Sequence, residues 1–436
     1  MRSRLVARLT LATLFAACCL IPATSGQAAS NAVPTRFGAP TVFIHYYDWY
    51  GAPPLSPTYG HWDGGSIRRP DPSQNITSAS FPVLGAYDSS SASVVRQHMA
   101  WIKAAHVDVV SLDWFGQGSL EDRLARPVMD GAAAQGLKVN FVINPYSGES
   151  VASIGSDIAY IYRKYGSHRA FYRASRPTKY GPSTKARGLF MLYNPPAPRL
   201  YYSDYSKLMD KIRGTANDAI VLVRTDDRLL YSDANLRPYL SALHFDGMFN
   251  YGVYGKADYQ RQLPQSNDYI LMFSVGPGFD NSRAAGITSP VKIARSNGST
   301  YDGGWSALIA RRPEWISVVS FNEWHETSQI EPARPLSYGA FRYLDYVGAY
   351  GLRGSAASNA YITRTALWAD RFKGKVRQPS ASASPSTSPT RPPTGTPSPP
   401  PSAPAAALRE LPRFALILVV IGGLIAAAVV LWRRRR

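Results

Sequence analysis

Eight short apolar runs in the middle of the chain constrain its fold more than any other feature. Each run is rich in β-branched or aromatic residues and is bounded by turn-forming residues, which is typical of buried strands. Helical periodicity separates several runs and is clearest over Ser91–Ala105 and Ile154–Tyr165. The runs are Val42–Tyr47, Val107–Trp114, Leu137–Asn144, Gly188–Tyr193, Ala219–Arg224, Phe245–Asn250, Tyr269–Val275 and Trp315–Phe321.

Strands that alternate with helices run parallel, because each helix returns the chain to the same end of the sheet. Eight such strands within residues 36–375 predict an α/β fold of the (β/α)8 TIM barrel type, for which this length is normal. A doubly wound open sheet is the alternative, but no glycine-rich phosphate-binding loop follows the first run.

The ends of the predicted strands carry side chains that suit sugars. Active sites of (β/α)8 barrels lie at the carboxyl ends of the strands. An aromatic face stacks on a sugar ring, while carboxylates and amides bond its hydroxyls, so we predict a carbohydrate site there. The candidate residues at the strand ends are Tyr46, Tyr47, Asp48, Asp113, Trp114, Asn144, Tyr146, Tyr193 and Tyr251.

The eighth run ends in Asn322, Glu323, Trp324, His325 and Glu326. Carboxylates are rarely buried unless they are paired, and an aromatic ring beside them lowers the local dielectric constant. Two glutamates three residues apart at a strand end therefore predict acid/base chemistry on a ring-shaped substrate.

Two other interpretations of the carboxylates remain open. The glutamates could lie on a solvated loop or pair with Arg311, Arg312 or Arg334. Alternatively, Asp48 or Asp113 could be a catalytic carboxylate of an ordinary two-acid mechanism.

Several stretches of the chain carry a resemblance to a known family. They are Tyr46–Gly51 with His61 and Trp62 downstream, Asp157–Arg173, Phe245–Gly247, Val275–Gly278 and Ser320–Ala333. Together they resemble glycoside hydrolase family 99, the endo-α-mannosidases, whose distant barrel relatives form family 71. The resemblance covers residues 40 to 335, and its last stretch is the most specific.

The resemblance implies a retaining, endo-acting α-mannoside hydrolase. Glu326 would protonate the leaving oxygen and then act as base toward water. Glu323 would deprotonate the sugar 2-hydroxyl, which attacks the anomeric carbon to give a 1,2-anhydro sugar. This differs from the usual retaining pair, in which one carboxylate becomes glycosylated. A general acid needs a raised pKa and a base must be ionised, so we expect the two carboxylates to have different environments.

The matched stretches add further candidate sugar contacts and one departure. The family usually has Glu-Pro-Tyr after the third strand, whereas this chain has Asn144-Pro145-Tyr146, which cannot supply the charge. His168 is either a sugar ligand or a structural histidine at a helix end. The added candidate substrate-binding residues are His61, Trp62, His168, Asn322, Trp324 and His325.

Both ends of the chain predict targeting. Residues 1–29 combine three arginines with an apolar stretch and small residues, as in a secretory signal peptide, and they hold both cysteines of the chain. Residues 376–412 form a disordered Pro/Ser/Thr-rich linker. Residues 413–432 are apolar and long enough to span a bilayer, and the arginines of 433–436 place this end in the cytoplasm. We expect a single-pass protein of a bacterial cell membrane, with its catalytic domain extracellular.

The charge of the chain follows from these ends. Without residues 1–30 and 371–436, 34 basic and 28 acidic residues remain, a net charge of +6 in place of +19. Nucleic acid is therefore not an expected partner. We expect a monomeric catalytic domain that binds an α-linked oligo- or polysaccharide. No cofactor or metal is expected, since a zinc site from His61, Asp113 and His325 lacks the usual spacing.

Two further functional hypotheses remain beside the α-mannosidase. One is an α-1,3-glucanase-like hydrolase, which would share the fold. The other is a non-catalytic carbohydrate-binding surface protein. Product release from a panel of α-mannans and α-glucans separates the three.

Overall fold

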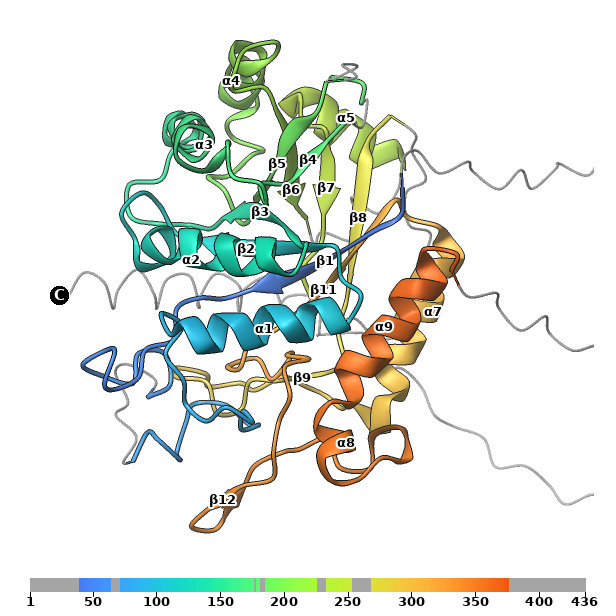
Figure 1. Ribbon diagram of the computed structural model, residues 1–436. Coiled ribbons are helices and arrows are strands. Elements are labelled where there is room, and N and C mark those ends of the chain that lie inside the picture. The colour runs from blue at the N-terminus through green and yellow to red at the C-terminus, as the bar shows by residue number, and fades with distance from the viewer. Residues whose placement is uncertain are drawn as a thin grey trace, which may run out of the picture. The chain divides into compact units, whose positions relative to one another are not determined.

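The computed structural model describes residues 39–63, 71–175, 178–180, 185–225, 233–252 and 268–375 (Figure 1). The predicted signal peptide, linker, transmembrane helix and cytoplasmic tail lie outside these residues. Among the helices of the described ranges, none is both long and apolar enough to cross a membrane.

Within the described ranges, eight parallel strands close into a barrel. β1 pairs with β2 on one side and with β11 on the other, so that Ile44 lies opposite Val110 and Val318. This closure confirms the predicted barrel and excludes the open sheet. The strands are β1 (Thr41–Tyr46), β2 (Val109–Trp114), β3 (Lys138–Ile143), β5 (Arg187–Leu192), β6 (Ala219–Arg224), β7 (Gly247–Phe249), β8 (Ile270–Val275) and β11 (Trp315–Val318).

Helices follow the barrel strands and lie on their outer side (Figure 1). The two predicted helices correspond to α1 and α3. The helices are α1 (Ala92–Ala104), α2 (Leu120–Ala134), α3 (Val151–Tyr165), α4 (Tyr202–Ile212), α5 (Asp233–Leu243), α7 (Ser299–Arg311), α8 (Gly354–Ser358) and α9 (Ala360–Phe372), with 3₁₀ turns η2 (Ser296–Gly298) and η3 (Ala349–Gly351). Short strands are β4 (Arg173–Ala174), β9 (Phe279–Asp280), β10 (Lys292–Ile293), β12 (Ser337–Tyr338) and β13 (Phe341–Arg342).

Local sequence starts the helices that follow β2 and β3. Ser119 caps α2 by accepting a 3.0 Å hydrogen bond from the Asp122 N–H. At α3, Ser150 and Ser153 bond each other's backbone N–H reciprocally, at 3.1 and 2.9 Å. Such caps satisfy N–H groups that have no partner inside the helix, each contributing about 1 kcal/mol. They fix where the loops at the carboxyl ends of β2 and β3 stop.

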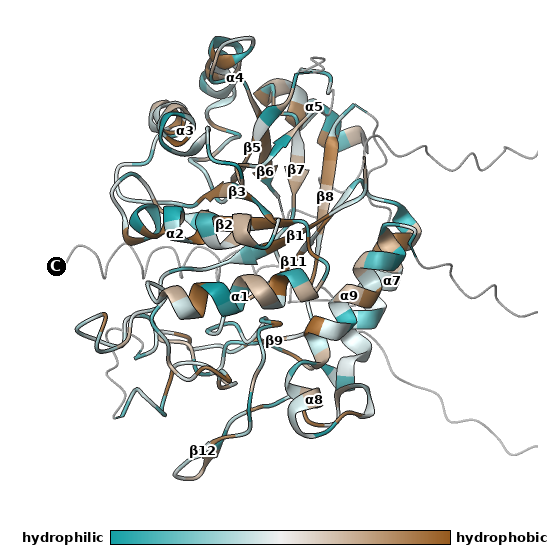
Figure 2. Cartoon of the chain, viewed as in Figure 1, coloured by the Kyte–Doolittle hydropathy of each residue, from teal (hydrophilic) through white to brown (hydrophobic). Residues whose placement is uncertain are grey.

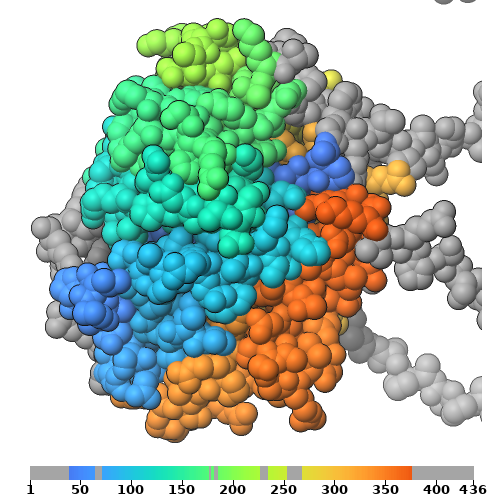
Figure 3. Space-filling view, in the orientation of Figure 1, coloured from blue at the N-terminus to red at the C-terminus, as the bar shows by residue number. Residues whose placement is uncertain are grey.

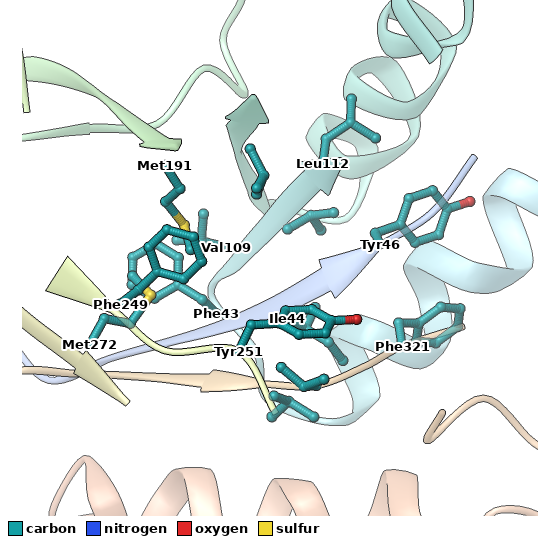
Figure 4. Close-up of a cluster of buried hydrophobic side chains, with 14 of the residues drawn as sticks. Phe43, Ile44, Tyr46, Val109, Leu112, Met191, Phe249, Tyr251, Met272 and Phe321 are labelled. Atoms are coloured by element: carbon teal, nitrogen blue, oxygen red, sulfur yellow. The ribbon is translucent and has the colours of Figure 1, made fainter. Parts of the chain in front are cut away.

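Apolar side chains fill the interior of the barrel. Phe43, Val109, Met191, Phe249 and Met272 come from five strands and converge at its centre (Figure 4). The strands are accordingly the most hydrophobic elements, while the helices mix apolar and polar faces (Figure 2). A close-packed interior gives the strand ends above it a rigid floor.

The Phe245–Gly247 stretch has a structural role at β7. Asp246 is fully buried and accepts hydrogen bonds from the Val221 N–H at 2.9 Å and from Arg213 at 2.8 Å. A β-carbon at Gly247 would overlap the carbonyl oxygen of Ile270, so only glycine allows β7 and β8 to approach. This stretch therefore fixes the strand from which Tyr251 reaches the site.

The last helix completes the outer layer beside α1. His106 Nδ1 lies 2.8 Å from Asp370, and the Lys373 ammonium donates to the His106 carbonyl at 2.7 Å. The segment of α1 and the segment of α9 adjoin on the molecular surface (Figure 3). These contacts join the first and last helices around the strands that carry the site.

Candidate active site

The chain after β11 forms a loop at the carboxyl ends of the strands. Ser320 closes it, since its N–H donates to Ser328 at 3.0 Å and its carbonyl accepts from Ile330 at 2.9 Å. The Asn322 amide accepts from the Tyr47 N–H at 2.9 Å and donates to the Tyr47 carbonyl at 2.7 Å. Asn322 thus ties this loop to the end of β1, and its amide is used for positioning.

The loop holds Glu323 in a nearly closed environment, with 4% of its surface exposed. Its N–H donates to Ser320 Oγ at 2.7 Å, and its Oε1 accepts from the His325 N–H at 3.0 Å. Burial raises the pKa of Glu323 well above its usual value, and the nearby Glu326 carboxylate raises it further. The His325 N–H opposes this effect by stabilising the ionised form.

Glu326 is partly buried and is held more loosely. Its Oε2 accepts from the Tyr251 hydroxyl at 3.3 Å, and that hydroxyl lies 2.6 Å from the Tyr47 hydroxyl. Burial raises the pKa of Glu326 to about 7, while Arg224 and the Tyr251 hydroxyl lower it and Asp113 raises it. Glu326 therefore retains a proton near neutral pH, which a general acid requires.

Arg224, the last residue of β6, is the cation of this site. Its guanidinium lies 4.2 Å from the centre of the Tyr193 ring and 5.6 Å from that of Tyr251, and it donates to Asn194 Oδ1 at 2.9 Å. The sequence analysis missed Arg224, although its position at the end of a predicted strand was the available signal. The sequence had left open a pairing of the glutamates with Arg311, Arg312 or Arg334. In the described structure, the arginine whose charge lowers the pKa of Glu326 is Arg224.

The expected difference between the two glutamates takes another form. We expected the acid to have a raised pKa and the base to remain ionised. In the unliganded site burial raises the pKa of both, because aromatic and carboxylate groups surround the pair, and Glu323 is the more deeply enclosed. Burial therefore acts on both carboxylates in the same direction, and the environment of the unliganded site alone does not divide their roles.

Asp113 and Asn144 lie together beside this pair, as the sequence predicted. The Asn144 amide donates to Asp113 Oδ1 at 2.8 Å, and His45 Nδ1 lies 3.1 Å from Asp113 Oδ2. The Asp113 charge raises the pKa of both glutamates. Asp48 is also fully buried, but the charge that most raises its pKa after burial itself is Glu121 of α2. Of these two aspartates, Asp113 is therefore the one whose charge acts on both Glu323 and Glu326.

An aromatic stack borders the loop. The rings of Trp49 and His61 are parallel with centres 4.7 Å apart, and Tyr47 lies 4.5 Å from Trp49. His325 lies 6.3 Å from Trp49, and its Nε2 forms a short hydrogen bond with the His61 carbonyl. Trp49 was missed by the sequence analysis, although it lies within the matched Tyr46–Gly51 stretch. Trp49 is partly exposed, and an aromatic side chain of this kind can contact a sugar ring.

Four predicted sugar contacts are instead packed in the core with their polar atoms bonded. They are Tyr46, Trp62, Trp114 and Trp324, all fully buried. The Tyr46 hydroxyl lies 3.0 Å from His98 of α1 (ring drawn in Figure 4), and the Trp114 indole donates to Asp122 at 3.1 Å. Their ring size suggested ligands, but Tyr46 and Trp114 lie on barrel strands, where alternate side chains point outward to the helices. Trp62 and Trp324 lie in loops, where their indoles donate to the Tyr87 carbonyl and to Glu331.

The remaining candidates divide by position. Tyr193 and Tyr251 pack edge to face at 5.1 Å beside Glu326. Tyr146 lies at the end of β3, with its hydroxyl donating to Asp157 at 2.5 Å. His168 follows the carboxyl end of α3, the opposite end of the barrel from the site, and lies 2.9 Å from Asp130. His168 is therefore the structural helix-end histidine and not a sugar ligand.

A (β/α)8 barrel with two shielded carboxylates among tyrosines and a partly exposed tryptophan defines a carbohydrate-active hydrolase. The chain belongs to glycoside hydrolase family 99, whose family model matches residues 39–374. It is thus a glycoside hydrolase of an endo-α-mannosidase-like kind, as the sequence analysis predicted.

Individual relatives agree with this assignment. The chain is 30% identical over 386 residues to a glycoprotein endo-alpha-1,2-mannosidase-like protein of Danio rerio, covering 80% of this chain and 82% of the relative. It is 29% identical over 363 residues to the glycoprotein endo-alpha-1,2-mannosidase of Rattus norvegicus, covering 76% and 75%. The solved structure of the family 99 endo-alpha-mannosidase from Bacteroides thetaiotaomicron is similar at a TM-score of 0.65 and 28% identity, over 76% of this chain and 97% of that one.

Proposed function

We propose that the protein is an exported, membrane-anchored, retaining endo-α-mannosidase that acts through a 1,2-anhydro sugar. Glu326 protonates the leaving oxygen and later takes a proton from water, and Glu323 takes the proton of the sugar 2-hydroxyl. The observation that carries the proposal is the loop of residues 320–330. It presents both carboxylates beside Tyr251 and Arg224 at the carboxyl end of the barrel.

The environment of Glu326 suits both halves of its role. Its pKa of about 7 keeps the proton available for the first step at neutral pH. Arg224 and the Tyr251 hydroxyl stabilise the ionised form, so that Glu326 can then accept a proton from water. An acid that must become a base in the next step works best with a pKa near the working pH.

The environment of Glu323 suits a base for a hydroxyl group. A sugar hydroxyl is a very weak acid, so the carboxylate that removes its proton gains from a raised pKa. Burial and the charge of Glu326 supply that increase. The His325 N–H holds Oε1 in one direction at 3.0 Å. The 2-hydroxyl then serves as nucleophile, and Glu323 forms no covalent bond to the sugar.

The names of similar proteins support α-mannosides as substrate. The similar proteins of Danio rerio and Rattus norvegicus carry the names of endo-alpha-1,2-mannosidases, and the similar bacterial structure is an endo-alpha-mannosidase. Asn144 occupies the position where the family usually has glutamate, and its amide is engaged by Asp113. The sugar subsite at β3 is therefore the place where this enzyme's glycan preference departs from that of its relatives.

The full-length enzyme should be tested on a panel of α-mannans, mannose oligosaccharides and α-glucans with sizing of the products. Release of oligosaccharides from α-mannans with retained anomeric configuration in early NMR spectra is the expected result. Cleavage of α-1,3-glucan alone would assign the alternative glucanase activity. The absence of any released reducing ends from an enzyme that binds these glycans would contradict hydrolysis.

The 1,2-anhydro route has its own test. A 2-deoxy analogue of the best aryl α-mannoside lacks the internal nucleophile and should not be hydrolysed. Turnover of this analogue, with a glycosylated glutamate trapped by mass spectrometry, would establish the ordinary retaining mechanism instead.

Export and anchoring rest on the terminal sequences. The apolar segment 413–432 is followed by four arginines, which favours a cytoplasmic tail and an external catalytic domain. Protease treatment of intact cells should remove residues 39–375 from the membrane fraction while leaving a cytoplasmic marker intact. Full protection of the domain in intact cells, with digestion only after lysis, would contradict this orientation.

A further inference from the structure

Three buried polar side chains form a cluster on neighbouring strands beside the glutamate pair. His45 lies on β1, Asp113 on β2 and Asn144 directly after β3, and they are 0%, 1% and 5% exposed. Asp113 accepts from the Asn144 amide at 2.8 Å through Oδ1, and its Oδ2 lies 3.1 Å from His45 Nδ1. Both oxygens of the carboxylate are thereby fixed in direction.

The cluster reaches Glu326 through one aromatic side chain. The His45 ring packs edge to face against Tyr251 with centres 5.0 Å apart. The Tyr251 hydroxyl donates to Glu326 Oε2 at 3.3 Å. Asp113, His45 and Tyr251 are all buried, so the protein between the Asp113 charge and the partly exposed Glu326 screens that charge less than bulk water would.

Stability alone gives no reason to keep this carboxylate. In the described part of the chain no lysine or arginine forms an ion pair with Asp113, and its fixed partners are an imidazole and an amide. Burial raises the pKa of Asp113, and the charge and hydrogen bond of His45 together with the Asn144 amide oppose that rise. An asparagine of similar shape would avoid the cost of burying the charge. A charge retained under these conditions beside an acid/base pair indicates a role in the reaction.

We propose that Asp113 is a positioning residue of the hydrolase, whose buried negative charge holds the proton on Glu326, and that His45 and Asn144 keep this charge in place. The proposal rests on the assignment of Glu326 as general acid. It adds a third carboxylate to the site, supplied by β2.

The neighbours of Glu326 give the expected direction of the effect. The Asp113 charge raises the pKa of Glu326 and also that of Glu323, whereas Arg224 lowers the pKa of Glu326. Removal of the Asp113 charge should therefore let both glutamates lose their protons at lower pH. Among the described residues, the titratable and charged groups near Glu326 include Glu323 on its own loop, Asp113 on β2, Arg224 on β6, Tyr251 after β7, Tyr47 after β1 and Asp280 of β9, whose N–H donates to the Glu326 carbonyl at 2.7 Å.

The test is the pH dependence of kcat/KM for the full-length Asp113→Asn variant. Asparagine keeps the shape and removes the charge, but its single amide oxygen accepts from only one of the two partners, so the hydrogen bond to the other partner, Asn144 or His45, must reverse its direction. Both limbs of the profile should move to lower pH, by on the order of one pH unit. A folded Asp113→Asn enzyme with the wild-type profile would overturn the proposal.

A matched control and a rescue separate charge from structure. Asp130 also lies 2.9 Å from a histidine, His168, but at the opposite end of the barrel. Asp130→Asn should leave the profile unchanged, and an equal shift in this control would overturn the proposal. The double variant Asp113→Asn/Asn144→Asp moves the carboxylate to the next strand and keeps the bond between the two side chains, so it should restore the wild-type limbs.

The rescue variant also covers a failure of folding. If Asp113→Asn alone does not fold, the pH profile of kcat/KM is measured for the folded double variant and compared with that of the wild type. A profile displaced from the wild-type profile by a pH unit or more overturns the proposal. The proposed function fails in a different way, since a wild-type enzyme that releases no product would refute the reaction. An active wild type with an unmoved Asp113→Asn profile refutes only the role of Asp113.

Discussion

Glu326 and Glu331 are five residues apart on the same segment, and the structure uses them in opposite ways. Glu331 is fully buried, and its Oε2 accepts from the Tyr87 hydroxyl and the Trp324 indole, both at 2.9 Å. Its Oε1 lies 3.2 Å from His98 Nε2. Glu326 is partly exposed, and in the described structure its carboxylate accepts one hydrogen bond, from the Tyr251 hydroxyl at 3.3 Å.

The difference between them distinguishes a structural carboxylate from a reactive one. A buried carboxylate whose oxygen accepts from two fixed protein donors has little capacity left for substrate. A carboxylate in a poorly hydrated site with few donors keeps its proton to higher pH and can transfer it. Both residues are glutamates of the same segment, so residue type and location in the sequence do not separate them. Only their partners in the fold distinguish them.

The largest expected effect is on activity at Glu326. Glu326→Gln should lower kcat by about 10²–10⁴-fold, because it removes the proton donor and leaves the shape of the site. Oligosaccharide binding, measured by calorimetry, should persist. Glu331→Gln is the matched control and should keep activity per folded molecule within about tenfold. Equal losses of kcat in the two folded variants would contradict the distinction between Glu326 and Glu331.

The second expected effect is on stability, for which Glu331 should matter more than Glu326. Glu331→Ala removes the carboxylate that accepts from the Tyr87 hydroxyl and the Trp324 indole and leaves a cavity in the core, so unfolding in urea at pH 7 should require about 3–5 kcal/mol less free energy.

Glu326→Gln should instead stabilise the protein at pH 8. The pKa of Glu326 is raised from 4.5 to about 7 on folding, so its contribution to stability is lost as pH rises from about 4.5 to about 7. Gln has no such loss, and the gain should be on the order of 1–3 kcal/mol at pH 8 and absent at pH 4. A destabilised Glu326→Gln variant at pH 8 would show that this carboxylate is structural as well.

The third expected effect is the pH dependence of the wild-type reaction. The value of kcat/KM should fall about tenfold per pH unit above about 7, where Glu326 loses its proton. It should fall again in acid, where the pair takes up a second proton. Initial rates in a buffer series of constant ionic strength measure both limbs, and full activity maintained to pH 9 would exclude Glu326 as the acid.

The smallest expected effect is a shift of the pH profile when Arg224 is substituted. Arg224→Gln removes a charge that lowers the pKa of Glu326, so the basic limb of kcat/KM should move to higher pH by less than about one unit. Arg224→Lys keeps the charge and should show a smaller displacement. A shift to lower pH in Arg224→Gln would contradict the assigned direction.

Sequence reasoning predicted the elements and the location of the site better than the contacts within it. All eight apolar runs form barrel strands, because strand-length apolar patterns are local. β11 ends at Val318, three residues before the predicted end, since Ser320 and Phe321 bond to Ser328 and His45 instead of continuing the ladder. Such a departure depends on partners that are distant in sequence, and no local pattern reports it.

The aromatic candidates illustrate the same limit. Tyr46 and Tyr47 are adjacent in sequence, but alternation along β1 sends Tyr46 outward to His98 and Tyr47 toward Tyr251. Trp324 was predicted to contact sugar, yet its indole bonds Glu331. The sense of the alternation is set by which face the barrel closes around, and this is a tertiary property.

The sequence by itself determined the barrel, the family and the pair of glutamates at the end of the last strand, because strand length, periodicity and short motifs are local. The tertiary structure alone decided the charges and hydrogen-bond partners that surround each carboxylate. Arg224 comes from β6, Tyr251 follows β7 and Asp113 lies on β2, and their charges and hydrogen bonds meet at Glu326 only when the barrel closes. The pKa of a carboxyl group depends on desolvation and on charges within a few ångströms, and both are properties of the closed fold.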